Sequence, residues 1–338
     1  MVNTSWLKIS KPGLYVLPAK AHIDPIRAVD TAIITHGHSD HARPGHQHVI
    51  ATKQTIAIMS ARYGENFANQ KTALTYNDKF TLGEVEVKLI PAGHVLGSAQ
   101  IVLKYDNTKI IAAGDYKRRF DPTCVPFQVE QCDVFITEAT FGLPVFSHPK
   151  PEDEIKKLIQ VRHLFPERSI AVLAYSLGKA QRLIALLRAA GYNETIFIHG
   201  AVKKLCELYQ SFGIQLGNLQ TIPLDKIENH NSSLANKFII APPSAIGTKW
   251  AQRLPDPLVV SASGWMQVRQ RAKQGGVELP LIISDHADWN DILRTIQEVK
   301  ATQVWITHGR EDALIHACSQ MGLDAKALSL IGYEDETE

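Results

Sequence analysis

The sequence predicts an α/β fold of two domains, one inserted into the other. Three observations support this prediction. Between residues 169 and 263, short β-branched runs alternate with amphipathic stretches, a pattern typical of a parallel, doubly wound sheet. On both sides of that region, apolar runs end in histidine or a carboxylate. Two segments rich in proline or glycine, residues 142–153 and 273–280, lie between these regions and indicate linkers.

The composition is that of an ordinary globular protein. The 338 residues correspond to about two domains of roughly 150 residues each. A hydrophobic content of 45% with 21% charged residues excludes disorder as the main state. Lys and Arg number 36 and Asp and Glu 34, which leaves a net charge of +2. A net charge this small does not indicate a protein that attracts polyanions through its overall electrostatic field. Any nucleic-acid contact must therefore come from local clusters of basic residues.

The chain carries no recognisable signal for secretion or membrane insertion. Its first residues lack an apolar core, and no run approaches the roughly 18 apolar residues that a membrane span requires. We therefore expect a cytoplasmic protein without membrane contact. The four cysteines include no C-x-x-C pair, which favours reduced, buried thiols over disulfides or a thiolate zinc site.

Six apolar strands are predicted outside the central region, and each ends beside a side chain that can bind metal. They lie at residues 32–35, 87–90, 109–114, 134–137, 281–285 and 303–307, and they lead into His36, His94, Asp115, Glu138, His286 and His308. Because ligands collect outside the carboxyl ends of strands in α/β sheets, these residues can converge. The first domain then comprises residues 1–143 and 280–338, and the insertion comprises residues 144–279.

Four β-branched runs predict the strands of the inserted domain, at residues 169–175, 195–199, 238–242 and 257–263. Helix-periodic stretches follow the first two of these runs, at residues 178–191 and 201–213. Strands that alternate with helices form β-α-β units, whose strands pair in parallel.

The sharpest local signal is the hexapeptide His36-Gly-His-Ser-Asp-His41. Its first two imidazoles, at i and i+2 of an extended segment, point to the same side. Asp40 and His41 lie where the chain is expected to turn toward a helix, so they can reach a second position nearby. One segment can thus supply ligands to two adjacent cations. Imidazole and carboxylate ligands suit Zn²⁺, with Mn²⁺ or Fe as alternatives because no thiolate contributes.

Two further residues supply what the hexapeptide lacks. His94 follows a strand within the glycine-containing segment 91–98, and Asp115 follows Gly114 at the end of another strand. Each residue by itself would more often be an ordinary turn or core residue. Together they provide a third histidine for the first metal and a carboxylate that can bridge two metals.

In their order and context these residues resemble the metallo-β-lactamase fold, whose most diagnostic motif is matched by residues 33–41. Residues 136–141, 284–288 and 306–309 resemble three further motifs of the β-CASP subgroup of nucleases. The resemblance spans essentially the whole chain and implies an αββα sandwich interrupted by an inserted, β-CASP-like doubly wound α/β domain. More narrowly, the compact length and residues 261–266 resemble bacterial exonucleases associated with a DNA ligase and a helicase.

The resemblance implies a site with two divalent metal ions, zinc in preference to manganese. It assigns His36, His38 and His94 to the first metal, Asp40, His41 and His308 to the second, and Asp115 to both. The expected catalytic residues are His286 as general acid, Glu138 as its hydrogen-bond partner, and the metal-binding Asp40. Asp24 would support a ligating imidazole through a hydrogen bond.

Seven polar side chains are expected to contact substrate phosphates. Lys117, Arg118 and Arg119 follow Asp115, Ser176 opens a predicted helix that carries Lys179 and Arg182, and Ser263 lies in the segment 261–266. An ordinary solvated face and an ordinary capped helix are equally compatible with these patterns.

The expected function is that of a dinuclear metal-dependent nuclease on single-stranded nucleic acid, most simply a DNA exonuclease in repair that works with a DNA ligase and a helicase. An RNase of the mRNA-processing or RNA-maturation type is the first alternative. A catalytically silent scaffold that binds nucleic acid or a partner is the second. A small-ester or thioester hydrolase is the third, although it would need neither the insertion nor Glu138. The sequence does not indicate cleavage polarity or oligomeric state.

Overall fold

The computed structural model describes residues 2–222, 234–274 and 276–328, which form two compact units. Unit 1 contains the described parts of Met1–Ser147 and His286–Thr337, and unit 2 contains those of His148–Asp285. Both boundaries lie a few residues beyond those expected from the sequence. At the second boundary the reason is strand pairing, because β17 (Leu279–Leu281) belongs to the sheet of unit 2.

Unit 1 is built on two mixed sheets. The first has the order β1-β2-β3-β4-β5-β6 and contains β1 (Leu7–Ser10), β2 (Gly13–Val16), β3 (Ala21–Ile23), β4 (Thr31–Ile33), β5 (His46–Thr52) and β6 (Ala68–Leu74). The second has the order β19-β18-β11-β10-β9-β8-β7 and contains β7 (Lys79–Leu82), β8 (Val85–Pro91), β9 (Ala99–Tyr105), β10 (Thr108–Ala112), β11 (Val134–Ala139), β18 (Gln303–Gly309) and β19 (Asp324–Ala327). In the second sheet β10, β11, β18 and β19 run parallel.

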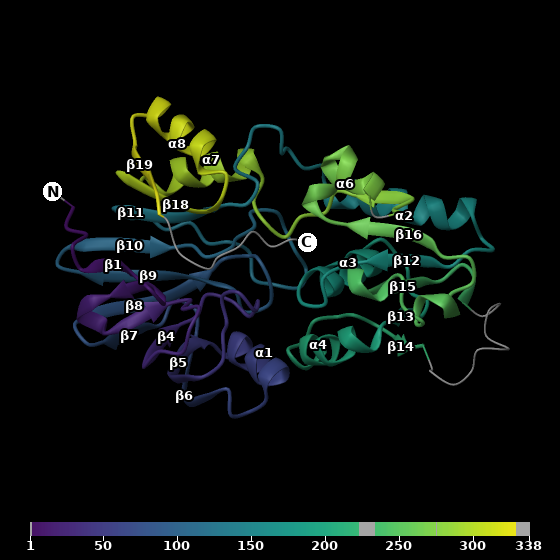
Figure 1. The fold of residues 1–338 in the computed structure, drawn as a ribbon, viewed down its shortest axis with the longest axis horizontal. Helices are drawn as coiled ribbons and strands as arrows, with labels where there is room; N and C mark the ends of the chain where they lie inside the picture. The colour runs from purple at the N-terminus through teal and green to yellow at the C-terminus, as the bar shows by residue number, and fades with distance from the viewer. Residues whose placement is uncertain (1, 223–233, 275, 329–338) are drawn as a thin grey trace. The chain divides into compact units, whose positions relative to one another are not determined.

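The hydrophobic core of unit 1 has three layers of side chains, which separate four layers of secondary structure. Side chains of both sheets, such as Ile50 and Val134, pack together between them. The opposite face of the second sheet packs against α7 (Trp289–Val299) and α8 (Glu311–Gln320), and α1 (Lys53–Tyr63) covers the first sheet (Figure 1). Strand alternation explains this division, because neighbouring side chains of β11 point to opposite faces. Unit 1 is therefore an αββα sandwich, as expected.

Unit 2 contains the parallel, doubly wound sheet that the alternating pattern predicts. Its order is β14-β13-β15-β12-β16-β17, in which β15 lies between β12 and β13, while β16 and β17 follow on the other side of β12. The strands are β12 (Ile170–Leu173), β13 (Ile196–Ile198), β14 (Leu219–Thr221), β15 (Phe238–Ala241), β16 (Leu258–Ala262) and β17. The α-helices of this unit include α2 (Pro151–Leu164), α3 (Lys179–Ala189), α4 (Gly200–Ser211) and α6 (Arg269–Gln274). β12 and β15 are buried along their whole length, as covered parallel strands are.

Two local expectations are wrong. The hexapeptide does not lead into a helix, because the chain makes turns, enters β5 and reaches α1 only at Lys53. Pro44 disfavours helical geometry in the residue before it, and Gly45 has a φ of 94°. The strand expected at residues 281–285 is also displaced, since β17 ends at Leu281.

None of the described helices has both the length and the apolar character that crossing a membrane requires.

The core of unit 1 allows a test of its packing. Phe135 of β11 is fully buried between the second sheet and the two C-terminal helices. We expect Phe135→Ala to lower the free energy of unfolding by about 3–5 kcal/mol, because it removes a ring and leaves a cavity. Guanidinium unfolding followed by circular dichroism measures the effect. Val145→Ala is the control, since Val145 is 62% exposed and should change stability by less than about 0.5 kcal/mol. Equal losses in the two variants would contradict the described core.

Candidate metal centre

Four of the predicted ligands meet at one point of unit 1. His36 and His38 follow β4, His94 follows β8, and Asp115 follows β10. One donor atom from each of these four residues can be chosen so that all lie within 4.8 Å of one another, and all four side chains are buried. The carboxyl ends of strands from both sheets thus deliver these residues to the same place.

The separations between donor atoms fit the coordination sphere of one transition metal. Two ligands that each lie about 2.0 to 2.1 Å from one ion, at the tetrahedral angle, stand about 3.3 Å apart. His38 Nδ1 lies 3.1 Å from His36 Nε2 and 3.1 Å from His94 Nε2. Asp115 Oδ2 lies 3.4 Å from His36 Nε2 and 3.8 Å from His94 Nε2. Three imidazoles and a carboxylate without thiolate are a ligand set that suits zinc and related divalent ions.

The imidazole of His36 is held in the state that a metal requires. Burial, followed by the neighbouring imidazoles of His41, His94 and His38, keeps the pKa of His36 well below its ordinary value. The ring is therefore neutral at neutral pH and offers a lone pair. A metal ligand must be deprotonated, so this environment prepares His36 for binding.

The buried carboxylate of Asp24 orients two of these rings. It accepts hydrogen bonds from the Thr35 amide at 2.7 Å and the Thr35 hydroxyl at 2.5 Å. It also lies 2.8 Å from His41 Nδ1, while the Thr35 hydroxyl lies 3.0 Å from His36 Nδ1. With both Nδ1 atoms engaged, the Nε2 atoms of His36 and His41 face Asp115, at 3.4 and 3.5 Å. The residue expected to support a ligating imidazole therefore contacts one directly and one through Thr35.

The residues predicted for the second metal adjoin the first group. Asp40 Oδ2 lies 3.4 Å from His41 Nε2, and the rings of His41 and His308 have centroids 5.4 Å apart. His308 is the extra residue of a β-bulge, because Glu138 pairs with Thr307 and the next residue pairs with Gly309. Its φ of 53° departs from strand geometry, and a bulge of this kind re-aims a side chain. The second metal site itself stays a prediction.

His41 lies among three carboxylates, which determine its ionisation. Burial opposes its protonation, but Asp40, Asp115 and Asp24 together outweigh burial and raise the pKa of His41 well above its ordinary value. The negative charge of these carboxylates thus favours a positive charge beside them, which a divalent metal ion would also provide.

His286 and Glu138 form a buried pair beside the first group. His286 Nδ1 lies 2.8 Å from Glu138 Oε2, and Glu138 Oε1 accepts a hydrogen bond of 2.8 Å from the Tyr116 amide. The rings of His286 and His94 have centroids 4.8 Å apart. Asp115, Glu138 and His286 also have donor atoms within 4.8 Å of one another, so Asp115 belongs to both groups.

Helix α1 supports both loops that carry the histidines of the first group. Arg62 donates a hydrogen bond of 2.7 Å to the Gly37 carbonyl, between two of the ligands. Ile58 packs beneath Gly37 so closely that a Cβ there would lie 2.5 Å from Ile58 Cγ2. The Thr52 hydroxyl, at the start of the helix, donates to the Gly97 carbonyl at 2.7 Å. The sequence does not indicate this role of Arg62, since no local pattern links the residue to a carbonyl 25 positions earlier.

The five cationic side chains expected to contact phosphate have ion-pair partners within their own units. In unit 1, Lys117 pairs with Asp121 at 2.6 Å, Arg118 with Glu298 at 2.6 Å and Arg119 with Asp288 at 2.7 Å. In unit 2, the buried Arg182 and Lys179 lie 2.9 and 4.0 Å from the Asp285 carboxylate. The Ser263 hydroxyl accepts from the Trp265 amide, and the Ser176 carbonyl accepts from Gln181. Phosphate contact by these seven residues stays a prediction.

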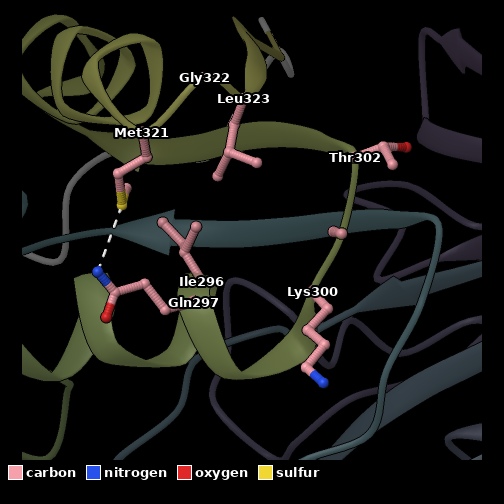
Figure 2. A pocket seen from close by; sticks show the side chains of 8 residues that line it. Ile296, Gln297, Lys300, Thr302, Met321, Gly322 and Leu323 are labelled. Atoms are coloured by element: carbon pink, nitrogen blue, oxygen red, sulfur yellow. Dashed lines mark hydrogen bonds between the residues drawn. The ribbon is translucent and has the colours of Figure 1, made fainter.

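A surface pocket of about 600 Å³ lies elsewhere in unit 1. It is bounded by the C-terminal end of α7 and the turn after α8, where Gln297 donates a hydrogen bond of 3.6 Å to the Met321 sulfur (Figure 2). Ile296 and Leu323 make its wall largely apolar, and Lys300 is its charged residue. None of the predicted ligands lines this pocket.

The chain has recognisable relatives among known proteins. Residues 9–168 match the Metallo-beta-lactamase superfamily. The chain is 26% identical over 329 residues to a "Probable DNA ligase" of Opitutus terrae, an alignment that covers 96% of this chain and 31% of that protein. It is 24% identical over 345 residues to an "RNase J-like protein" of Methanocaldococcus jannaschii, which covers 84% of this chain and 82% of the relative.

These relatives differ from the chain in length. The chain spans about a third of the ligase, 31% of its residues. Among solved structures, a protein of unknown function from Enterococcus faecalis V583 matches with a TM-score of 0.54 and 14% identity, over 81% of this chain and 74% of that one. This likeness concerns the fold alone.

The contact between Arg62 and Gly37 generates a prediction about metal affinity. We expect Arg62→Ala to raise the dissociation constant for Zn²⁺ by about 10- to 100-fold, because groups that hold ligand loops contribute on this scale. Competition with a chromophoric chelator measures the constant. Lys53→Ala, an exposed lysine at the start of the same helix, is the matched control and should bind zinc as the unaltered protein does. Unchanged affinity in Arg62→Ala would show that the helix does not hold the loop.

Proposed function

The chain carries a metallo-beta-lactamase superfamily domain, and on that basis we propose that it is a metal-dependent nuclease that hydrolyses phosphodiester bonds in single-stranded nucleic acid. The main support for the proposal is that Asp115 belongs to two groups of side chains. This carboxylate belongs both to the group His36, His38 and His94 and to the pair Glu138 and His286. A metal-binding group and a proton donor adjacent to it are the two parts that phosphodiester hydrolysis requires.

The proposed cofactor is a pair of divalent ions, zinc in preference to manganese. When bound, such a pair supplies a nucleophile at neutral pH and neutralises charge that develops on the phosphate. His36, His38 and His94 would hold one ion, Asp40, His41 and His308 the other, and Asp115 both. Asp24 keeps two of these imidazoles in the tautomer that leaves Nε2 available.

In the proposed mechanism His286 protonates the departing oxygen. Its Nδ1 atom is engaged by Glu138, so Nε2 is the atom that passes a proton to the substrate. Glu138 thereby fixes the orientation of the ring, and its own carboxylate is oriented by the hydrogen bond that Oε1 accepts from the Tyr116 amide. Both side chains are buried.

We favour DNA as the substrate, cleaved from an end during repair. The likeness to a probable DNA ligase over 96% of this chain supports this choice and suggests a ligase as functional partner. RNA is the second candidate, and the likeness to an RNase J-like protein over 84% of the chain supports it. Cleavage of DNA and cleavage of RNA would use the same metal-binding residues. A direct comparison of the two substrates therefore decides between them.

The nuclease proposal is tested with strands of DNA and RNA labelled at the 5′ or the 3′ end, in Mn²⁺ or Zn²⁺. We expect cleavage by the unaltered protein, with DNA consumed faster than RNA. Asp115→Asn should lower the rate by at least about 1,000-fold, because it removes the carboxylate common to both groups. Asp324→Asn, an exposed carboxylate on β19, is the control and should cleave normally. Retained cleavage in Asp115→Asn would rule out this mechanism.

The role of His286 is tested separately. We expect His286→Ala to lower the cleavage rate by about 10²- to 10⁴-fold, the usual contribution of a positioned acid, while the metal content stays normal. Elemental analysis of the purified variant measures the metal, and single-turnover kinetics measure the rate. If the variant loses metal instead, His286 is a ligand and another group must protonate the leaving oxygen.

A further inference from the structure

The loop of residues 116–124, which follows Asp115 in unit 1, is anchored to the segment that carries His94. The Lys117 amide donates to the Ala92 carbonyl at 3.1 Å, and its ammonium group donates to the His94 carbonyl at 2.9 Å. The same ammonium group forms a buried ion pair of 2.6 Å with Asp121. Removing either partner of a buried pair is strongly destabilising, so this side of the loop is firmly fixed.

The other side of the 116–124 loop is anchored to the segment after His286. The Ala287 amide donates to the Tyr116 carbonyl at 2.7 Å. Arg119 pairs with the buried Asp288 carboxylate at 2.7 Å, and Asp288 also caps the first turn of α7. The loop is therefore attached both to a predicted metal ligand and to the segment that begins with the predicted proton donor.

Phe120 projects from this anchored loop into solvent. It lies between Arg119 and Asp121, and 67% of it is exposed, the largest value among the exposed large hydrophobic residues of the described chain. Asp121 beside it is buried and also accepts hydrogen bonds from the Thr123 amide and hydroxyl at 2.8 and 2.7 Å. A phenylalanine on a mobile loop could fold inward, but the contacts on both sides of Phe120 hold its backbone in place.

The chemistry around Phe120 selects the kind of ligand. The three cations of the loop, Lys117, Arg118 and Arg119, form ion pairs with carboxylates of unit 1. What the loop presents outward is thus an aromatic face. Aromatic side chains bind single-stranded nucleic acid by stacking on bases, without sequence preference because every base has a π-face.

We propose that Phe120 is a stacking platform for a nucleobase of the substrate strand. The inference rests on the proposed nuclease function and adds a binding contact to it. The loop that carries Phe120 follows Asp115 directly and is fastened both to the His94 carbonyl and to the segment after His286, so it borders the residues at which we place the phosphodiester bond. Phe120 would hold a base of a neighbouring nucleotide and position the strand without touching the reacting atoms.

The test compares ordinary single-stranded DNA with a strand of the same length that carries abasic residues. We expect Phe120→Ala to raise KM for the ordinary strand by about 5- to 150-fold, the range that loss of one stacked base implies, with little change in kcat. On the abasic strand Phe120→Ala and the unaltered protein should behave alike. Phe120→Trp should retain tight binding. Val125→Ala is the matched control and should have no effect, because Val125 is also exposed, at 48%, and directly follows the 116–124 loop.

Binding measurements keep this inference distinguishable from the nuclease proposal. Fluorescence anisotropy gives the dissociation constants of both strands for the unaltered protein and for Phe120→Ala, whether or not cleavage occurs. If no strand is cleaved but Phe120→Ala weakens binding of the ordinary strand alone, the stacking site stands and the nuclease proposal fails. Equal binding by both proteins, which would be expected if Phe120 contacts a protein partner, overturns the stacking site. An equal loss on the abasic strand overturns it too.

Discussion

Burial of several imidazoles around one carboxylate is the constraint on which unit 1 depends. His36, His38 and His94 approach one another to hydrogen-bond distance with Asp115 beside them, and all four are removed from water. Buried polar atoms need hydrogen-bond partners, because unpaired polar groups are expensive to bury. Asp24 supplies such contacts beside this group, since it lies against the ring of His41 and reaches the ring of His36 through the Thr35 hydroxyl.

The supports of this group come from opposite parts of unit 1. Helix α1 holds the Gly37 carbonyl through Arg62, and Lys117 holds the His94 carbonyl. Each cation thereby satisfies a backbone oxygen beside a ligand, and this fixes the loop without adding another donor to the metal. Support of this kind holds the donor atoms at separations that suit a coordination sphere.

The three cations that follow Asp115 form ion pairs within unit 1. The run Lys117, Arg118 and Arg119 suggests a phosphate-binding patch, yet all three side chains form ion pairs with acidic residues of the same unit. Their pairing fastens the 116–124 loop to the rest of unit 1 and leaves Phe120 as its outward feature.

The sequence by itself determined the α/β class, the central doubly wound sheet and the side chains that follow each strand, because these features depend on local periodicity of two or 3.6 residues. It also indicated Asp24 and the hexapeptide. Only the tertiary structure decided what the cations bind, since Arg118 and Glu298 are 180 positions apart. It likewise decided that α1 supports Gly37 and that a bulge displaces His308. Pairing of charges and the register between strands depend on distances in space, which no local pattern of residues encodes.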